Sequence, residues 1–371
     1  IMKKMLKMAL ISIIFIPALA FAEVNVVSWG GAYTESQKLG YGDPYQEMSG
    51  VKVNWIDYSG GLSEVRTQVE SGNVTWNIID LYAKDTITGC DEGLLVEFDF
   101  DNDFPAAPDG TKASDDFFTD MPSKCAVGNI LYSWNYAYSP DVFPGQDVMP
   151  STIVDFYDTA KYPGKRAIYN GAMSNLEQAL VADGVSADAV YGVLENQTGA
   201  VDRAIAKIRT LCEDPNGGCI FWSAGAQPPE LLASGEVVMA TGWNGRFFNA
   251  VVGEGTNIVQ VWDGQILDYE YFAMIAGSPN QDEAMDALRY FTGTEGLAGS
   301  AKYIAYAPWR VSSLDIIEAG EPWYKDGTTN MMPNMPTAAA NTENYILMNP
   351  DYWADNEVEV GEAWEAFKSS L

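Results

Sequence analysis

Three side chains stand at or just past the ends of β-rich segments: Trp29, Ser59 and Tyr82. Ligands of parallel α/β sheets normally bind beyond the carboxyl ends of the strands. Aromatic faces can cover the methylene groups of a ligand, and they attract cations by about 0.5–2 kcal/mol each. The types and positions of these side chains therefore predict a binding cleft.

The segments that must position these side chains alternate between strand and helix, which is the pattern of a doubly wound parallel sheet. The first unit has predicted strands at 24–29, 51–56 and 77–82 and predicted helices at 32–48 (interrupted at 40–44) and 62–71. A second α/β unit has predicted strands at 165–169, 235–242 and 257–262 and predicted helices at 175–182 and 200–211. A strand at 271–275 and a helix at 281–291 indicate a return to the first unit, with crossings near 136–140 and 303–309.

Composition excludes several kinds of chemistry. The chain has no histidine, which removes Ser-His-Asp and Cys-His nucleophile systems and the usual zinc sites. The formal net charge of −30 repels nucleic acid and anionic membranes and attracts cations. Acidic surfaces are also a general adaptation to salty surroundings, so this charge permits a cationic ligand without identifying one. Asp99, Asp101 and Asp103 alternate as in a calcium loop, but Phe104 and Gly110 stand where the bending glycine and the bidentate glutamate belong, so no metal site is expected.

The beginning of the sequence predicts export. Residues 2–22 have a basic start, an apolar run from 8 to 19 and an Ala-Phe-Ala ending, which is the pattern of a cleavable signal peptide. The apolar run is too short for a membrane anchor. The roughly 349 residues that remain suit two lobes rather than one core.

Four cysteines in an exported chain favour disulfides, and three pairings are possible. Cys212 and Cys219 close a short loop rich in turn-forming residues, which leaves Cys90 with Cys125. We favour this pairing.

Five segments, in order along the chain, resemble the spermidine/putrescine-binding proteins of bacterial ABC importers. They are 90–95 (CDEGLL), 162–166 (YPGKR), 225–239 (GAQPPELLASGEVVM), 243–246 (WNGR) and 262–266 (WDGQI). The resemblance runs from about Val24 to the C-terminus. It implies a type II periplasmic-binding-protein fold, with two doubly wound α/β lobes, a hinge crossed twice and a central ligand cleft. The lobes are expected at 23–138 plus 268–306 and at 139–267 plus 307–371.

The resemblance also implies a function. We expect a monomeric periplasmic receptor, without catalytic residues or cofactor, that binds a polyamine and delivers it to a membrane permease with its ATPase. Carboxylates would pair with the ammonium groups, since an unpaired buried charge is prohibitive, and aromatic rings would wall the cleft. The residues at matching positions are the walls Trp29, Tyr82 and Trp243, the acids Glu177, Asp268 and Glu270, Asp85 in the loop after the third strand that faces the ligand, and Trp353 at the cleft edge.

Two positions depart from the family pattern. Lys84 stands where relatives often have an acid, and acids are missing at Asn170 and Gly171. If Lys84 points into the cleft, it would repel an ammonium group. The ligand could therefore be an amino-acid-like zwitterion or a quaternary amine. An exported hydrolase with paired carboxylates is a further alternative, although no spacing singles out such a pair.

Overall fold

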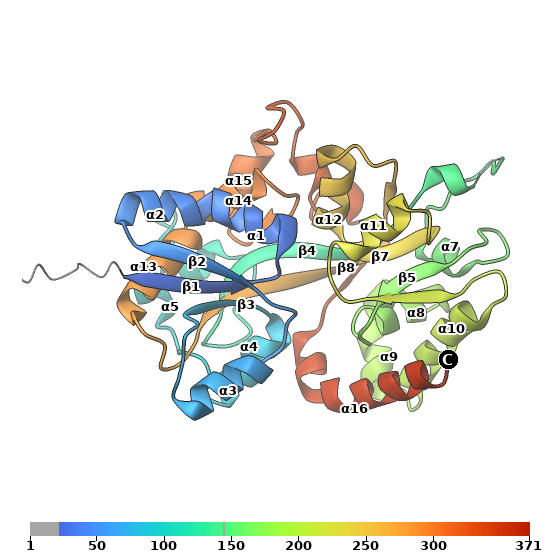
Figure 1. The fold of residues 1–371 in the computed structure, drawn as a ribbon, viewed down its shortest axis with the longest axis horizontal. Helices are drawn as coiled ribbons and strands as arrows, with labels where there is room; N and C mark the ends of the chain where they lie inside the picture. The colour runs from blue at the N-terminus through green and yellow to red at the C-terminus, as the bar shows by residue number, and fades with distance from the viewer. Residues whose placement is uncertain (1–21, 144) are drawn as a thin grey trace, which may run out of the picture.

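One mixed β-sheet runs through the whole molecule (Figure 1). The computed structural model describes residues 22–143 and 145–371. The sheet has the strand order β2-β1-β3-β8-β4-β7-β5-β6, with β10 beside β8 and β9 beside β4. The strands are β1 (Glu23–Ser28), β2 (Lys52–Asp57), β3 (Ile78–Tyr82), β4 (Val127–Tyr138), β5 (Arg166–Tyr169), β6 (Cys219–Trp222), β7 (Met239–Trp243), β8 (Val259–Met274), β9 (Ala307–Pro308) and β10 (Tyr345–Leu347).

Helices cover both faces of this sheet (Figure 1). They are α1 (Gly31–Gln37), α2 (Asp43–Ser49), α3 (Ser63–Ser71), α4 (Ala83–Asp91), α5 (Phe100–Asp103), α6 (Ala113–Asp116), α7 (Ile153–Tyr157), α8 (Asn175–Ala182), α9 (Val190–Asn196), α10 (Ala200–Glu213), α11 (Gln227–Ala233), α12 (Asn244–Phe248), α13 (Gln281–Phe291), α14 (Thr294–Ala301), α15 (Val311–Glu318) and α16 (Pro350–Ser369). A π-helical turn joins α1 to α2 at the predicted interruption.

The sheet has two parallel ends and an antiparallel middle. Strands β1, β2 and β3 are parallel in one lobe, and β5, β6 and β7 are parallel in the other. Between them lie β4 and β8, which pair with each other in antiparallel fashion. The expected two-lobed periplasmic-binding-protein fold is confirmed. The predicted strands at 257–262 and 271–275 are the two ends of the single strand β8. Since β4 and β8 belong to both lobes, the residue boundaries given for the lobes stay a prediction.

The C-terminal helix α16 packs under the second lobe and reaches the first (Figure 1). Trp364 packs edge-on against Phe221 of β6, with ring centroids 6.1 Å apart. The Nε1 of Trp364 donates to the backbone carbonyl of Asn170, at 3.0 Å. The helix also contacts α4 of the first lobe. It thus lies along the gap between the lobes.

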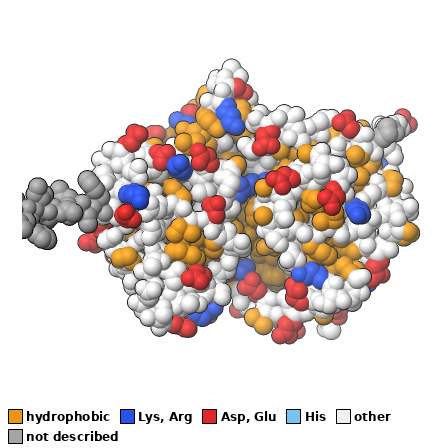
Figure 2. Space-filling view, in the orientation of Figure 1, with side chains coloured by type: hydrophobic (Ala, Val, Ile, Leu, Met, Phe, Trp, Pro, Cys, Tyr) orange, Lys and Arg blue, Asp and Glu red, His pale blue; other side chains and the backbone are white. Residues whose placement is uncertain are grey.

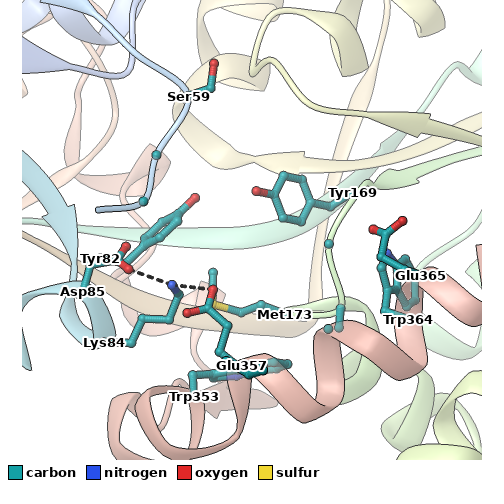
Figure 3. A pocket seen from close by; sticks show the side chains of 16 residues that line it. Ser59, Tyr82, Lys84, Asp85, Tyr169, Met173, Trp353, Glu357, Trp364 and Glu365 are labelled. Carbon is teal, nitrogen blue, oxygen red and sulfur yellow. Dashed lines mark hydrogen bonds and ion pairs between the residues drawn. The ribbon is translucent and has the colours of Figure 1, made fainter. Parts of the chain in front are cut away.

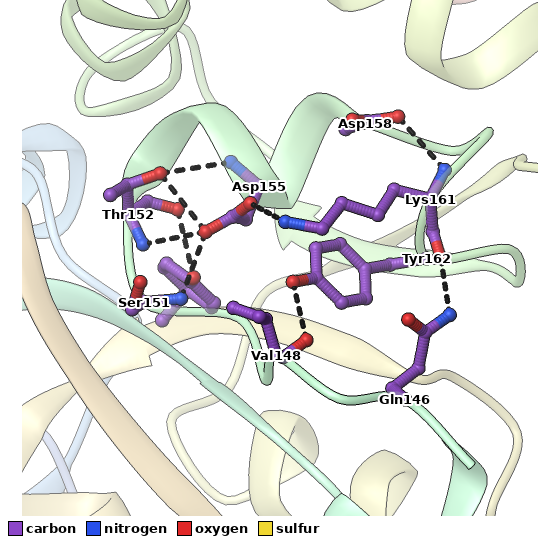
Figure 4. A network of polar contacts seen from close by, with 9 residues as sticks. Gln146, Val148, Ser151, Thr152, Asp155, Asp158, Lys161 and Tyr162 are labelled. Carbon is purple, nitrogen blue, oxygen red and sulfur yellow. Dashed lines mark hydrogen bonds and ion pairs between the residues drawn. The ribbon is translucent and has the colours of Figure 1, made fainter. Parts of the chain in front are cut away.

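The start of α7 is fixed by a reciprocal cap in the second lobe (Figure 4). The Thr152 hydroxyl accepts from the Asp155 backbone N–H, and the Asp155 carboxylate accepts from the backbone N–H of Thr152 at 3.0 Å. Lys161 places its ammonium 3.4 Å from Asp155. Such caps typically contribute about 0.5–2 kcal/mol, and this one fixes the start of the helix that precedes β5.

Both favoured disulfides, Cys90–Cys125 and Cys212–Cys219, are present. In the described part of the chain no three His, Cys, Asp or Glu side chains gather to hold a metal ion, and residues 100–103 form the short helix α5. The predicted signal peptide at 2–22 lies, except for its last residue, outside the described residues. Among the helices from residue 22 onward, outside position 144, none has the length and apolar character needed to cross a membrane.

Candidate functional site

The ends of β1, β3 and β7 bring three aromatic side chains together at the junction of the lobes. Trp29 follows β1, Tyr82 ends β3 and Trp243 ends β7. The Trp29 ring lies 4.6 Å from Tyr82 and 6.1 Å from Trp243, between centroids. The backbone of Glu270 in β8 pairs with that of Tyr82, which places this carboxylate in the same region. Four residues predicted for the cleft are therefore adjacent.

Glu270 is a buried carboxylate that faces another acid. It is 4% exposed and accepts a hydrogen bond from the Nε1 of Trp29, at 3.0 Å. Burial raises the pKa of Glu270 well above its usual value, and the nearby Asp80 raises it further. Asp80, fully buried in β3, accepts from Tyr33 and Gln37, at 2.7 Å each, and burial raises its pKa as well. Burial and mutual repulsion thus favour a pair that keeps a proton at a pH where ordinary carboxyls have lost theirs.

Arg246 supplies a cation to the same site, and the sequence reasoning missed it. Arg246 is 6% exposed, and its Nη2 donates to the carbonyl oxygens of Trp29 at 3.2 Å and Gly30 at 2.8 Å. No carboxylate among residues 22–143 and 145–371 lies within 4.0 Å of it, and its Nε has no acceptor there. A Cβ added at Gly31, where φ is +57°, would lie 2.9 Å from its Nη1, so glycine leaves room for the guanidinium.

The local sequence explains how Arg246 is held. Helix α12 begins directly after β7, at Asn244. The Asn244 side chain accepts from the Ser133 backbone N–H at 2.9 Å and donates to the Ala305 carbonyl at 2.6 Å. The WNGR segment therefore fixes both the aromatic wall and the cation. The signal in the sequence is the WNGR segment, because its last residue is the arginine that faces the cavity.

These groups surround a small inner cavity. Its lining consists of Trp29, Tyr33, Ile130, Tyr132, Trp243, Arg246, Glu270 and Tyr306. The space left is about 10 Å³, which is room for about one water molecule. A larger ligand does not fit the cavity in this conformation.

A larger outer pocket of about 460 Å³ is lined by Tyr82, whose ring centroid lies 4.6 Å from that of Trp29, a residue of the inner cavity. Figure 3 shows the Lys84 ammonium between the carboxylates of Asp85 and Glu357, at 2.8 and 2.7 Å. Trp353 of α16 also lines this pocket. The space-filling view shows a hollow between the two lobes with hydrophobic side chains at its base (Figure 2). Lys84 thus points into the cleft.

Two of the predicted acids line neither pocket. Asp268 accepts hydrogen bonds from Tyr132 at 2.5 Å and from Trp134 at 3.1 Å, and burial raises its pKa. Glu177 accepts from Trp353 Nε1 at 2.7 Å, and burial raises its pKa to about 7. Both acids are partnered by side chains of the core. A ligand contact for either one stays a prediction.

The chain belongs to a family of solute receptors. Residues 40–365 match the bacterial extracellular solute-binding proteins. Together with the two-lobed fold and the cleft, this defines a solute-binding receptor of an ABC importer, which works with a permease and an ATPase. Members of the family bind solutes rather than transform them, so the protein is a receptor and not an enzyme. The family is exported, in agreement with the predicted periplasmic location.

Individual relatives differ in what they bind. The gamma-aminobutyric acid-binding protein of Pseudomonas aeruginosa is 31% identical over 344 residues, which are 93% of this chain and 90% of that protein. A solved GABA receptor is 26% identical with a TM-score of 0.75, and the match covers 93% of this chain and 97% of the receptor. The spermidine/putrescine-binding protein of Streptococcus pneumoniae is 16% identical with a TM-score of 0.61, over 93% and 99% of the chains. That last likeness shows the fold alone.

Proposed function

We propose that this receptor binds a small zwitterion whose amino and carboxyl groups lie at opposite ends, such as GABA. The observation that carries the proposal is the presence of a buried guanidinium, Arg246, and a buried carboxylate, Glu270, on one cavity with aromatic walls. An arginine fork binds a carboxylate in a bidentate geometry. A carboxylate next to aromatic faces suits an ammonium group.

A polyamine fits this cavity less well. It carries only positive charges, so it offers nothing to Arg246 and is repelled by it. The quaternary nitrogen of a betaine has no N–H to donate to Glu270. The polyamine prediction is therefore replaced by the zwitterionic alternative, which the names of the two GABA-binding relatives also support.

The charged groups come from both lobes. Arg246 follows β7 in one lobe, whereas Trp29 and Glu270 lie at the end of β1 and beside β3 in the other. A zwitterion that pairs with both groups would hold the lobes together. The ligand would thus favour the closed form, by binding it better than the open form.

Isothermal titration calorimetry tests the proposal. The purified protein would be titrated with GABA, 5-aminovalerate, putrescine and glycine betaine at low salt. We expect saturable one-to-one binding of an ω-amino acid, weaker binding of betaine and none of putrescine. Arg246→Lys, which keeps the charge but loses the bidentate geometry of the guanidinium, should weaken zwitterion binding by roughly 10- to 100-fold. Tight putrescine binding with no response to either zwitterion would overturn the proposal.

A further inference from the structure

We propose that Lys84 is a specificity determinant: its ammonium occupies the cation site of the outer pocket and so excludes diamines and polyamines from the cleft. The inference deepens the proposed function, since it concerns what the same cleft rejects. Three features of the outer pocket carry it: two carboxylates, one aromatic face and the position of the lysine among them.

The environment of Lys84 has the acceptors that a ligand ammonium would seek. The Nζ of Lys84 lies 2.8 Å from Asp85 and 2.7 Å from Glu357, and it is 5.9 Å from the centre of the Tyr82 ring. Carboxylates and aromatic faces are the standard partners of an organic ammonium. Only 7% of Lys84 is exposed. The protein thus fills this cation site with its own side chain.

Lys84 keeps its charge in this position. Burial alone would lower the pKa of Lys84, but Asp85 and Glu357 together raise it. One oxygen of Asp85 is buried with no hydrogen-bond partner in the described part of the chain, so the pocket has acceptor capacity that Lys84 does not use up. Without the lysine, both carboxylates would be available to a foreign cation.

The outer pocket and the inner cavity are each lined by one residue of the same β3–β8 backbone pair. Tyr82 lines the outer pocket, and its backbone pairs with that of Glu270, which lines the inner cavity. A diamine with one ammonium at Glu270 would therefore direct the other toward Lys84. Two like charges about 4 Å apart in a partly buried site weaken binding by roughly 100- to 1,000-fold.

A purely structural role makes a different prediction. Asp85 and Lys84 are on α4 and Glu357 is on α16, so the ion pair also joins the two lobes. If joining the lobes were its whole role, removing Lys84 would weaken the binding of every ligand and would not allow any new ligand to bind. Gain of diamine binding is the readout that separates the two roles.

The test compares Lys84→Met with wild type and with Lys302→Met. Met keeps the length of the side chain without its charge. Lys302, half-buried and paired with Glu321 at 3.2 Å, lines neither pocket, so its replacement controls for the change in net charge. Putrescine, cadaverine and GABA would be titrated into each protein by calorimetry, at low and at high salt.

We expect Lys84→Met to bind a diamine at least about 100-fold more tightly than wild type and Lys302→Met do, with the gain falling as salt rises. Adding Glu357→Gln to Lys84→Met should remove most of the gain. Where Lys84→Met does not fold, Lys84→Gln replaces it, because its amide can donate to Asp85 without carrying charge. A folded Lys84 variant with unchanged diamine affinity overturns the inference, as does tight diamine binding by wild type.

The two proposals fail separately. If wild type binds no ω-amino acid but Lys84→Met gains diamines, the zwitterion proposal is wrong and the role of Lys84 stands. If wild type binds GABA and the Lys84 variants gain no diamine binding, the role proposed for Lys84 is wrong and the zwitterion proposal stands.

Discussion

Replacing Glu270 with glutamine should weaken ligand binding and stabilise the unliganded protein at the same time. Glu270 is buried beside Asp80, and its raised pKa reports that its charge is costly in the folded state. Glutamine keeps the size of the side chain and an oxygen that can accept from the Nε1 of Trp29. It removes the negative charge that a ligand ammonium needs.

The two effects have different magnitudes. Breaking a buried ion pair by removing one partner costs about 3–5 kcal/mol, which is a loss of affinity of roughly 150- to 5,000-fold. Removing a poorly solvated charge that faces another acid should stabilise the unliganded protein at pH 8 by about 1–3 kcal/mol. For a chain of this size, that gain raises Tm by roughly 1–4 °C.

Calorimetry with GABA and thermal unfolding followed by circular dichroism would measure the two effects. Glu236→Gln is the matched control, because Glu236 is exposed and its replacement makes the same change in net charge. Binding by Glu270→Gln within threefold of wild type would show that the ammonium group does not lie at Glu270. A lowered Tm would refute the argument that its charge is costly.

Three further results are expected. Zwitterion affinity should rise with pH, because a bound ammonium favours the charged form of Glu270 and so releases a proton held by the Glu270–Asp80 pair. The released proton is taken up by the buffer, so the binding enthalpy should change with the ionisation enthalpy of the buffer. A binding enthalpy that is the same in all buffers would contradict this. Glu177→Gln should leave ligand affinity within about threefold, since Glu177 lines neither pocket. Because burial raises the pKa of Glu177 from 4.5 to about 7, its contribution to stability is complete below about pH 4.5 and is lost as pH rises through 7. The Gln variant should therefore gain up to about 3 kcal/mol over wild type between pH 4.5 and pH 8, and denaturant unfolding at several pH values that shows no such trend would refute the assignment. Trp243→Phe, which keeps an aromatic wall, should weaken zwitterion binding by less than tenfold, whereas Trp243→Ala should weaken it by more than tenfold. Calorimetry measures both affinities, and equal losses would show that the aromatic ring of Trp243 does not contribute to binding.

The elements that the sequence predicts well are short and clearly bounded. The predicted strand 77–82 is a short, mainly apolar segment, and the structure has β3 at Ile78–Tyr82. Strand β4 was not predicted, because its residues Val127–Tyr138 are buried on both faces and show no alternation. Strand β8 spans most of both predicted strands, 257–262 and 271–275, and Gly264 lies between them. In the structure this glycine has a φ of +70° within a continuous strand, where a Cβ would lie 2.7 Å from Ile153.

The site was predictable as far as it depends on chain order. Trp29 and Tyr82 end predicted strands and Trp243 directly follows one, so their positions follow from topology. The environment of Arg246 does not follow from topology, because the absence of a carboxylate partner depends on tertiary packing. Asp80 has a recognisable signal: it is an acid among the apolar residues of β3, and acids are almost never fully buried unless they are paired.

The contacts that close the inner cavity explain how recognition and lobe closure can be one event. The indole N–H of Trp29 donates to Glu270, and the backbone carbonyl oxygens of Trp29 and Gly30 accept from Arg246. A zwitterion offers the same two functions, a donor and an acceptor, but each carries a charge, and charge-assisted hydrogen bonds are about twice as strong as neutral ones. A ligand that lacks either charge leaves one buried ion without a charged partner when the lobes meet, which costs several kcal/mol. Closure itself would therefore select for ligands that carry both charges, before the permease is reached.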